Sequence, residues 1–333
     1  MIRYFLRRVL LMTIVVFIVT TITFIISRFL PGDPASLWVG GHPTKEQLEI
    51  AREKFGLNDP LLVQYYKYIK QVSSFDLGVS LRTQQPVYGE IEKRFIATFE
   101  LVTVSFLIAV FIGFPIGLII AIKENRPIDY FFRGFGYLGL SIPVFWLGMI
   151  LQLIFFGYLD LFPLQGRFSW YSFQGETGGS LLLTCLLSGD WRMFFDLSRH
   201  LFLPATTLAL SIVGIIIRTV RSVTIDTMQE NHFITFLSYG FRPVEIISKL
   251  GYKNTLIPFS TVVGLSYGLL LGGTFLLETV FDWPGLGQFS TLSILTNDYP
   301  AIIGVTLLYT LMYVSINLIV DFLYVFLDPR LRR

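Results

Sequence analysis

The stretch ATFELVTVSFLIAVFIGFPIGLIIAI, residues 97–122, decides the class of fold because it carries a single charged residue, Glu100. An α-helix needs about 20 apolar residues to cross the hydrocarbon of a bilayer. The whole chain of 333 residues agrees, since it is 53% hydrophobic and only 15% charged, against about 25% charge in a typical soluble domain. The sequence therefore predicts an integral membrane protein.

Further apolar runs of spanning length bring the predicted number of membrane-spanning segments to six. Backbone groups in lipid are satisfied within a helix, and the alternating pattern of barrel strands is absent, so we predict an all-α protein. The apolar run nearest the N-terminus, residues 9–30, is longer than a signal-peptide core and has no small-residue cleavage site after it. We therefore expect it to remain in the protein as a membrane span. The other five runs are residues 9–30, 130–159, 201–220, 256–281 and 301–327.

Lysine and arginine residues gather in the connections on one side of the predicted bundle. By the positive-inside rule this side is cytoplasmic, and both termini lie on it. The long connection on the other side has its basic residues matched by acids, and long loops cross a membrane regardless of charge. The basic residues of the cytoplasmic side are Arg3, Arg7, Arg8, Lys123, Arg126, Arg133, Arg218, Arg221, Arg242, Lys249, Lys253, Arg330, Arg332 and Arg333.

The connection after the first span is predicted to fold into a helical extracytoplasmic cap. Apolar residues recur at helical spacing after a Pro-Thr-Lys-Glu turn, the helix closes at Gly56, and a second helix begins after Pro60. The sequence allows two interpretations of this cap: a pair of surface helices with ordinary packing, or a docking surface for an external partner. A shorter apolar run, residues 180–187, is too short to span and is expected on the outer face. We divide the chain into residues 1–30, 31–96 and 97–333.

Small residues and one proline mark the expected helix contacts. Small residues four apart let two helix backbones approach closely, either inside this chain or at a pore or dimer seam. Pro143 removes a backbone donor and should kink the third span. The glycines with this spacing are Gly113 and Gly117 in the second span, and Gly264, Gly268 and Gly272 in the fifth.

Few ionisable residues fall inside the spans, and they lie near the span ends: Glu100, Glu278 and Asp321. Such residues usually face protein or water, and no relay of buried acids and histidines typical of a proton pump is present. The single Cys185 and three scattered histidines do not form a metal-ligand pattern. We therefore predict no metal site and no catalytic residues.

A charged, glycine-broken stretch, FLSYGFRPVEIISKLGYKNTLIP, residues 236–258, separates the fourth and fifth spans. Helical spacing continues from the fourth span to Tyr239, Gly240 ends that helix, and Pro243 begins a second one. We call residues 221–256 the elbow. Its first arm is expected to expose large apolar side chains, among them Phe233, Phe236, Leu237 and Tyr239. A partner site and a loop resting on lipid headgroups are equally compatible with this pattern.

The elbow resembles the cytoplasmic EAA loop of permease subunits of binding-protein-dependent ABC importers, in its glycine and in KNTLIP at residues 253–258. The similarity extends from end to end, in the pattern of the dipeptide, oligopeptide and nickel permease branch. Phe236 and Ser238 stand where the family usually has small residues. The other similar stretches are SRFLPGDP (27–34), FDLGVSL (75–81), RFIATFEL (94–101), SIPVFWLG (141–148), LLETVFDWPGLGQ (276–288), DYPAIIG (298–304) and DPRLR (328–332).

The resemblance implies a type I ABC importer permease fold in the cytoplasmic, or inner, membrane of a prokaryote. It implies a second homologous permease, one or two cytoplasmic ABC ATPases that use ATP and Mg, an extracytoplasmic solute-binding protein, surrounding lipid, and no nucleic acid. No cofactor is expected in this chain, which has no G-x-x-x-x-G-K-[ST] phosphate loop. Matching positions imply ATPase-coupling roles for Thr235, Phe236, Ser238, Gly240, Phe241 and Arg242, and substrate-pathway roles for Ser141, Pro143, Gly268 and Glu278.

The family branch favours di- or oligopeptides as the cargo, with nickel chelates and oligosaccharides as alternatives. Two other classes of membrane protein fit the sequence less well. An intramembrane enzyme lacks a G-x-G-D motif or a serine with a histidine in the spans. A stand-alone channel or secondary carrier lacks evident broken-helix inverted repeats.

Overall fold

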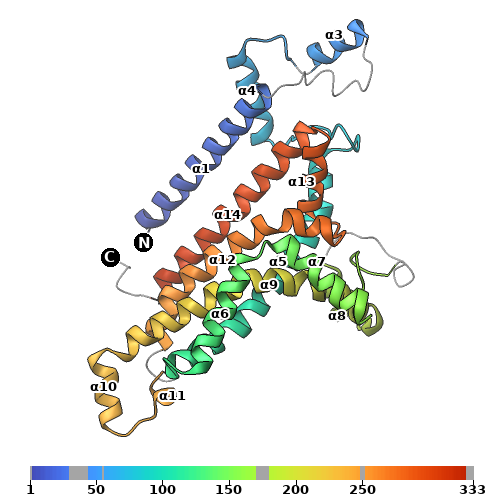
Figure 1. The fold of residues 1–333 in the computed structure, drawn as a ribbon. Helices are drawn as coiled ribbons and strands as arrows, with labels where there is room; N and C mark the ends of the chain where they lie inside the picture. Colours follow the sequence, from blue (N-terminus) through green and yellow to red (C-terminus); the bar gives the residue numbers. More distant parts are fainter. Residues whose placement is uncertain (1, 30–43, 55, 170–179, 248–251, 328–333) are drawn as a thin grey trace.

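A computed structural model describes residues 2–29, 44–54, 56–169, 180–247 and 252–327, which are almost entirely helical (Figure 1). The only β pairing among these residues is an isolated bridge between Val79 and Pro86. The helices are α1 Ile2–Phe29, α3 Lys45–Lys54, α4 Leu61–Ser73, α5 Val87–Ile122, α6 Pro127–Ser141, α7 Val144–Gln152, the π-helix η1 Leu153–Tyr158, α8 Leu181–Ser188, α9 Trp191–Met228, α10 Asn231–Ser238, α11 Pro243–Ile246, α12 Tyr252–Val280, α13 Leu286–Leu295 and α14 Tyr299–Leu327.

Within the described residues, five helices are long and apolar enough to cross a membrane, and a bent pair of helices makes a sixth span. The five are α1, α5, α9, α12 and α14. Figure 1 shows the start of α1 and the end of α14 at the same end of the molecule as α10 and α11. The prediction of an all-α membrane protein is confirmed.

The third apolar run is broken rather than kinked. α6 and α7 meet at Ile142 and Pro143 at an angle of 104°. Pro143 has no N–H to donate to the preceding turn, and its ring forces Ile142 into an extended conformation with φ −90° and ψ 127°. The sequence predicted a bend at Pro143, and the structure has it there.

The broken helix still passes from one end of the bundle to the other. At its start Asp129 accepts hydrogen bonds from Arg221, near the end of α9 that leads into the elbow. At its far end Gln152 donates to the carbonyl oxygen of Val280, the last residue of α12, at 3.2 Å. α6 and α7 together therefore make one crossing, which brings the number of crossings among the described residues to six.

α9 forms the centre of the bundle, packed against α5, α6, α7 and α12. Its apolar residues are buried on several sides, in contrast to α1, whose side chains such as Leu10 and Phe17 remain largely exposed. Burial on several sides explains why α9 carries more small residues than a helix that faces lipid. The central core includes Leu203, Leu208, Ile212, Ile216, Ile217 and Val220.

The predicted small-residue contacts join helices of this one chain. A Cβ atom added at Gly113 of α5 would collide with Ile216 of α9, and one added at Gly117 would collide with Val220. On α12, Gly264 and Gly268 lie against Val320 and Tyr313 of α14, whereas nothing lies within 4 Å of the corresponding position at Gly272. Packing within the chain therefore accounts for four of the five glycines.

The cap helices form as predicted. α3 ends before Gly56, whose φ of +60° lies in the left-handed region, and α4 begins directly after Pro60. α4 packs on α1 through two pairs of hydroxyls, Tyr65 with Thr21 at 2.7 Å and Tyr68 with Thr23 at 3.2 Å. Figure 1 shows α3 and α4 at the opposite end of the molecule from α10 and α11.

The closest approach of two backbones in the core gives a stability prediction. A Cβ added at Gly214 of α9 would collide with the backbone of Gly136 in α6, which cannot move as a flexible side chain would. We expect Gly214→Ala to lower the free energy of unfolding by roughly 1–3 kcal/mol, as overpacked cores do. The measurement is the thermal unfolding midpoint of the purified protein in nanodiscs.

The matched control is Gly134→Ala, an exposed position on α6 with nothing within 4 Å of the added atom. Because alanine favours a helix over glycine by about 1 kcal/mol, this variant should be neutral or slightly stabilised. Equal destabilisation by both substitutions would contradict the packing described for α6 and α9.

Candidate functional site

The elbow consists of two short helices that follow α9 and turn back toward the bundle. α9 ends at Met228 and α10 begins at Asn231, so the predicted continuous helix as far as Tyr239 is wrong. The break at Gln229 and Glu230 lets α10 leave the direction of α9. α11 then begins at Pro243, as predicted. Lys249, which sequence spacing pairs with Glu245 one helical turn earlier, lies outside the described residues.

The turn between α10 and α11 depends on Gly240. Its φ of +87° lies in the left-handed region that disfavours residues with a Cβ, and its N–H donates to the Leu237 carbonyl at 2.9 Å. Phe241 N–H donates to the Phe236 carbonyl at 3.2 Å, which closes the end of α10. Glu245 then accepts a hydrogen bond from the Arg242 N–H at 3.1 Å, which caps the start of α11. The glycine prediction is confirmed.

The inner face of the elbow is a small apolar core of its own. Phe233 of α10 is fully buried with Ile246 and Ile247, and this cluster packs against Leu118 and Ile122 at the end of α5. The prediction that Phe233 is exposed is therefore wrong. Helical spacing places it on the face opposite to Tyr239, but the sequence alone does not tell which face turns inward.

Most of the residues that the family resemblance singled out are accessible to solvent. Thr235, Ser238, Gly240, Phe241 and Arg242 are all exposed, and Phe236 is half-buried. The Phe236 and Phe241 rings meet edge to face with centroids 5.7 Å apart.

Large apolar side chains beside these residues are also exposed, and we call them, together with Phe241, the outer face of the elbow. Tyr239 is 77% and Val244 61% exposed. The sequence did not single out Ile234. It assigned Val244 to the apolar side of the second arm together with Ile246 and Ile247, but Val244 is exposed and the other two are buried. The full set is Ile234, Leu237, Tyr239, Phe241 and Val244.

A buried ion pair ties the base of the elbow to the third span. Arg221 Nε and Nη2 donate to the two carboxylate oxygens of Asp129 at 2.7 and 2.8 Å, and Asp129 is fully buried. Asp129 also accepts from the backbone N–H of Asn125 at 3.1 Å. Nothing local in the sequence signals this pair, because its members are 92 residues apart.

The four residues predicted to line a substrate pathway do not come together in one place. Ser141 and Pro143 are exposed at the break between α6 and α7. Gly268 lies against Tyr313 of α14. Glu278 is fully buried and accepts hydrogen bonds from Thr98 at 2.6 Å and from the backbone N–H of Gln288, in the first turn of α13, at 3.0 Å. The structure of the single chain leaves their pathway roles as predictions.

The other two carboxylates in the spans have partners within the chain. Glu100 pairs with the buried Arg167 and accepts a hydrogen bond from Ser180 at 2.6 Å. Asp321 of α14 pairs with Arg8 of α1 at 2.8 Å. Among the described residues, no three histidine, cysteine, aspartate or glutamate side chains gather in a group able to hold a metal ion.

Two protein-family descriptions together match nearly the whole chain. Residues 113–333 match "Binding-protein-dependent transport system inner membrane component". Residues 1–102 match the N-terminal part of the membrane component of the same kind of system. The chain belongs to this family, that is, to the permease subunits of binding-protein-dependent ABC importers of the dipeptide and oligopeptide type.

Similar full-length relatives carry names of transport permeases. The chain is 40% identical over 316 residues to the probable D,D-dipeptide transport system permease protein DdpB of Escherichia coli K12, covering 95% of this chain and 93% of the relative. It is 36% identical to the dipeptide transport system permease protein DppB of Alkalihalophilus pseudofirmus, with both chains covered completely. It is 34% identical to the glutathione transport system permease protein GsiC of Salmonella paratyphi A, covering 100% and 99%.

The Asp129–Arg221 pair gives a prediction for the base of the elbow. Asp129→Asn removes the charge opposite a guanidinium that is only 16% exposed, with Glu124 as a more distant acid at 3.6 Å. Breaking one side of a buried ion pair should lower the free energy of unfolding by roughly 3 kcal/mol. Thermal unfolding of the nanodisc-embedded protein measures the loss.

Arg133→Gln serves as the control, because its guanidinium lies 3.8 Å from the same carboxylate and is 37% exposed. A solvent-accessible pair of this kind contributes below about 1 kcal/mol. If both variants shifted the unfolding midpoint equally, the bidentate contact with Arg221 would not be the one that holds the elbow base.

Proposed function

We propose that the chain is one of two membrane subunits of an ATP-driven importer that takes up short peptides handed over by an extracytoplasmic binding protein. The peptide cargo is supported by three full-length relatives named for D,D-dipeptide, dipeptide and glutathione transport. These cargoes share an amino group, at least one carboxylate and amide bonds.

The exposed outer face of the elbow is the observation that supports an ATPase partner. An apolar surface with Tyr239 77% and Val244 61% exposed is costly in water, and such patches mark sites for another protein. It is presented on a rigid base formed by Phe233 and the end of α5. A short helix that inserts into a cleft is a recurrent way of docking. We propose that Thr235, Phe236, Ser238, Gly240, Phe241 and Arg242 contact an ABC ATPase, which binds ATP and Mg itself.

Two contacts connect the elbow to the membrane helices, so that a movement of the elbow would move them. Phe233 joins it to α5, and Arg221 joins its base to Asp129 of α6. When two ATPase subunits close on ATP, a displacement of the elbow is passed to both helices, which switches access between the two sides of the membrane. The second, homologous membrane subunit supplies the other half of the pathway. We propose substrate-pathway roles for Ser141, Pro143, Gly268 and Glu278.

The orientation follows from charge. Arg8 lies near the start of α1, and Arg221 lies near the end of α9 that leads into the elbow, where it pairs with Asp129. We propose that this end faces the cytoplasm of a prokaryotic cell, with both termini there, and that α3 and α4 face the binding protein.

The turn at Gly240 gives the sharpest test of coupling. Gly240→Val forces a β-branched residue into a φ of +87°, although nothing lies within 4 Å of the added atom. The strain therefore acts on the backbone of the elbow and not on packing. We expect ATP-driven uptake to fall at least tenfold, with normal amounts of protein in the membrane, measured in proteoliposomes that contain the whole complex.

Gly240→Asn is the matched control, since asparagine tolerates the left-handed region better than other residues with a side chain. This variant should keep most of the uptake. Equal and normal uptake by the Val variant would remove the elbow from the coupling mechanism.

The proposed function as a whole is tested by purification and transport. The chain is pulled from its native membranes in mild detergent, and its companions are identified by mass spectrometry. We expect a second six-span chain, one or two ABC ATPases and a binding protein. The reconstituted complex should then import radiolabelled alanyl-alanine only with ATP and the binding protein.

Two results would overturn this proposal. Isolation as a homo-oligomer without an ATPase would favour a channel or carrier. Transport of a nickel chelate or an oligosaccharide in preference to alanyl-alanine would keep the importer and replace the cargo.

A further inference from the structure

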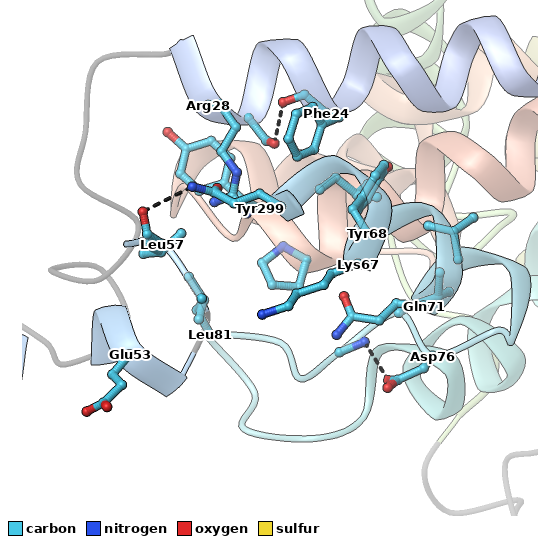
Figure 2. A pocket seen from close by; sticks show the side chains of 18 residues that line it. Phe24, Arg28, Glu53, Leu57, Lys67, Tyr68, Gln71, Asp76, Leu81 and Tyr299 are labelled. Atoms are coloured by element: carbon cyan, nitrogen blue, oxygen red, sulfur yellow. Dashed lines mark hydrogen bonds between the residues drawn. The ribbon is translucent and has the colours of Figure 1, made fainter. Parts of the chain in front are cut away.

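The cap helix α4 is attached to the outer end of α1 by side-chain contacts that fix its height along that helix. The hydroxyl oxygens of Tyr65 and Thr21 lie 2.7 Å apart, and those of Tyr68 and Thr23 lie 3.2 Å apart. The Tyr68 ring also lies against the Phe24 ring, with centroids 5.4 Å apart. Figure 2 shows this contact, with Phe24 on the side of α1 that faces α4.

These contacts place α4 at the edge of the hydrocarbon. The apolar segment of α1 is Leu6–Arg28, and a helix rises 1.5 Å per residue, so Thr21 is about 10 Å below the end of that segment. α4 therefore lies near the level where the acyl chains meet the headgroups. At this level α1 itself is open to lipid, since Ile22, Ile25 and Ile26 are 49%, 47% and 49% exposed.

Two sides of α4 face other parts of the chain. One side contacts α1 through Tyr65 and Tyr68. Another side lines a cavity of about 310 Å³ between the cap and the start of α14. Figure 2 shows Lys67 and Gln71 of α4 at this cavity.

The remaining side of α4 is apolar, and we call it the outward side. At about 100° per residue, Ile69, Leu62 and Tyr66 follow one another around the helix. They begin next to Tyr65, which contacts α1, and the exposed Lys70 comes after them. Leu62 is 83% exposed and Tyr66 is 70% exposed, and neither lines the cavity.

We propose that the outward side of α4 lies on the phospholipid surface of the outer leaflet. Leu62 and Ile69 then meet the ends of the acyl chains, Tyr66 lies among the headgroups, and the ammonium group of Lys70 reaches a lipid phosphate. Helices that lie in the interface carry apolar side chains on one face and lysines beside it, and tyrosine is enriched at this depth. A long lysine side chain can extend from apolar surface to a charged headgroup.

A phospholipid surface fits the outward side better than a second protein, because of what lies next to it. The apolar surface begins at the contact with α1, and only 11% of the apolar segment of α1 is buried. Figure 1 shows α1 and α4 at the edge of the bundle, beside α14. The inference depends on the proposed orientation only for which leaflet is meant, and it is independent of the cargo and the ATPase.

The experiment measures what surrounds the outward side in the whole complex, in nanodiscs of phosphatidylethanolamine and phosphatidylglycerol without the binding protein. The single Cys185 is replaced by serine, and a nitroxide is attached at Leu62→Cys or Tyr66→Cys. Electron paramagnetic resonance then compares collisions with oxygen, which concentrates in hydrocarbon, and with a nickel chelate, which stays in water.

Two reference positions set the scale of the oxygen-to-nickel ratio. Ile22→Cys lies on the exposed part of the α1 span, and Glu49→Cys lies at an exposed position on α3. We expect the ratio at Leu62→Cys and Tyr66→Cys to be several times that at Glu49→Cys and to approach that at Ile22→Cys.

Charge variants test whether the apolar side chains hold α4 on the lipid. Leu62→Glu adds a carboxylate to the outward side and should lower the ratio at Tyr66→Cys to the value at Glu49→Cys, since charge is excluded from hydrocarbon. Gln71→Glu is the matched control, because it adds the same charge to an exposed position on the cavity side of α4 and should leave the ratio unchanged. Both positions are exposed, so the thermal unfolding midpoint should stay constant.

Four outcomes would overturn the inference. A ratio at Leu62→Cys equal to that at Glu49→Cys would place the outward side in water. Protection from both reagents would mean that a protein, such as the second membrane subunit, covers it. A water-like ratio that changes to protection when the binding protein is added would make it a docking surface for that protein. An unchanged ratio in the Leu62→Glu variant would show that the apolar contact does not hold α4.

Discussion

The close packing of α9 against α5 and α6 is the constraint on which the rest of the structure depends. In lipid, helices gain little from hiding apolar surface from each other, so contact must come from fitting backbones tightly together. Gly117 and Gly136 provide this fit on either side of α9, and Gly214 of α9 leaves no room for a side chain. Once α9 is fixed, α7, α8 and α12 pack against what remains of its surface.

Buried carboxylates then join parts of the chain that are far apart in sequence. Glu278 fixes the first turn of α13 against α5, and Glu100 fixes the segment around Arg167 and the start of α8. Asp129 does the same at the other end of the molecule. A charge in the membrane is costly and is retained only with a partner, so these contacts act as fixed joints between helices. The elbow is attached to one of them, through Arg221 at its base.

Much of the fold was predictable because its main signals are local. Spanning length, the break at Pro143 and the turn at Gly240 each depend on residues next to one another. The errors arose where a distant segment decides the outcome. Phe233 is buried because α5 ends beside it, and Asp129 is buried because Arg221 reaches it from another helix.

The break at Pro143 also bears on how the protein is made. α6 has 15 residues, and α7 with η1 has 9 and 6, so neither half alone reaches the roughly 20 residues needed to span a bilayer. The two halves therefore have to enter the membrane together to make one span. α9, which both halves pack against, is synthesised later. The break at Pro143 is local, but the contacts that hold the two halves at 104° can form only once α9 has been made.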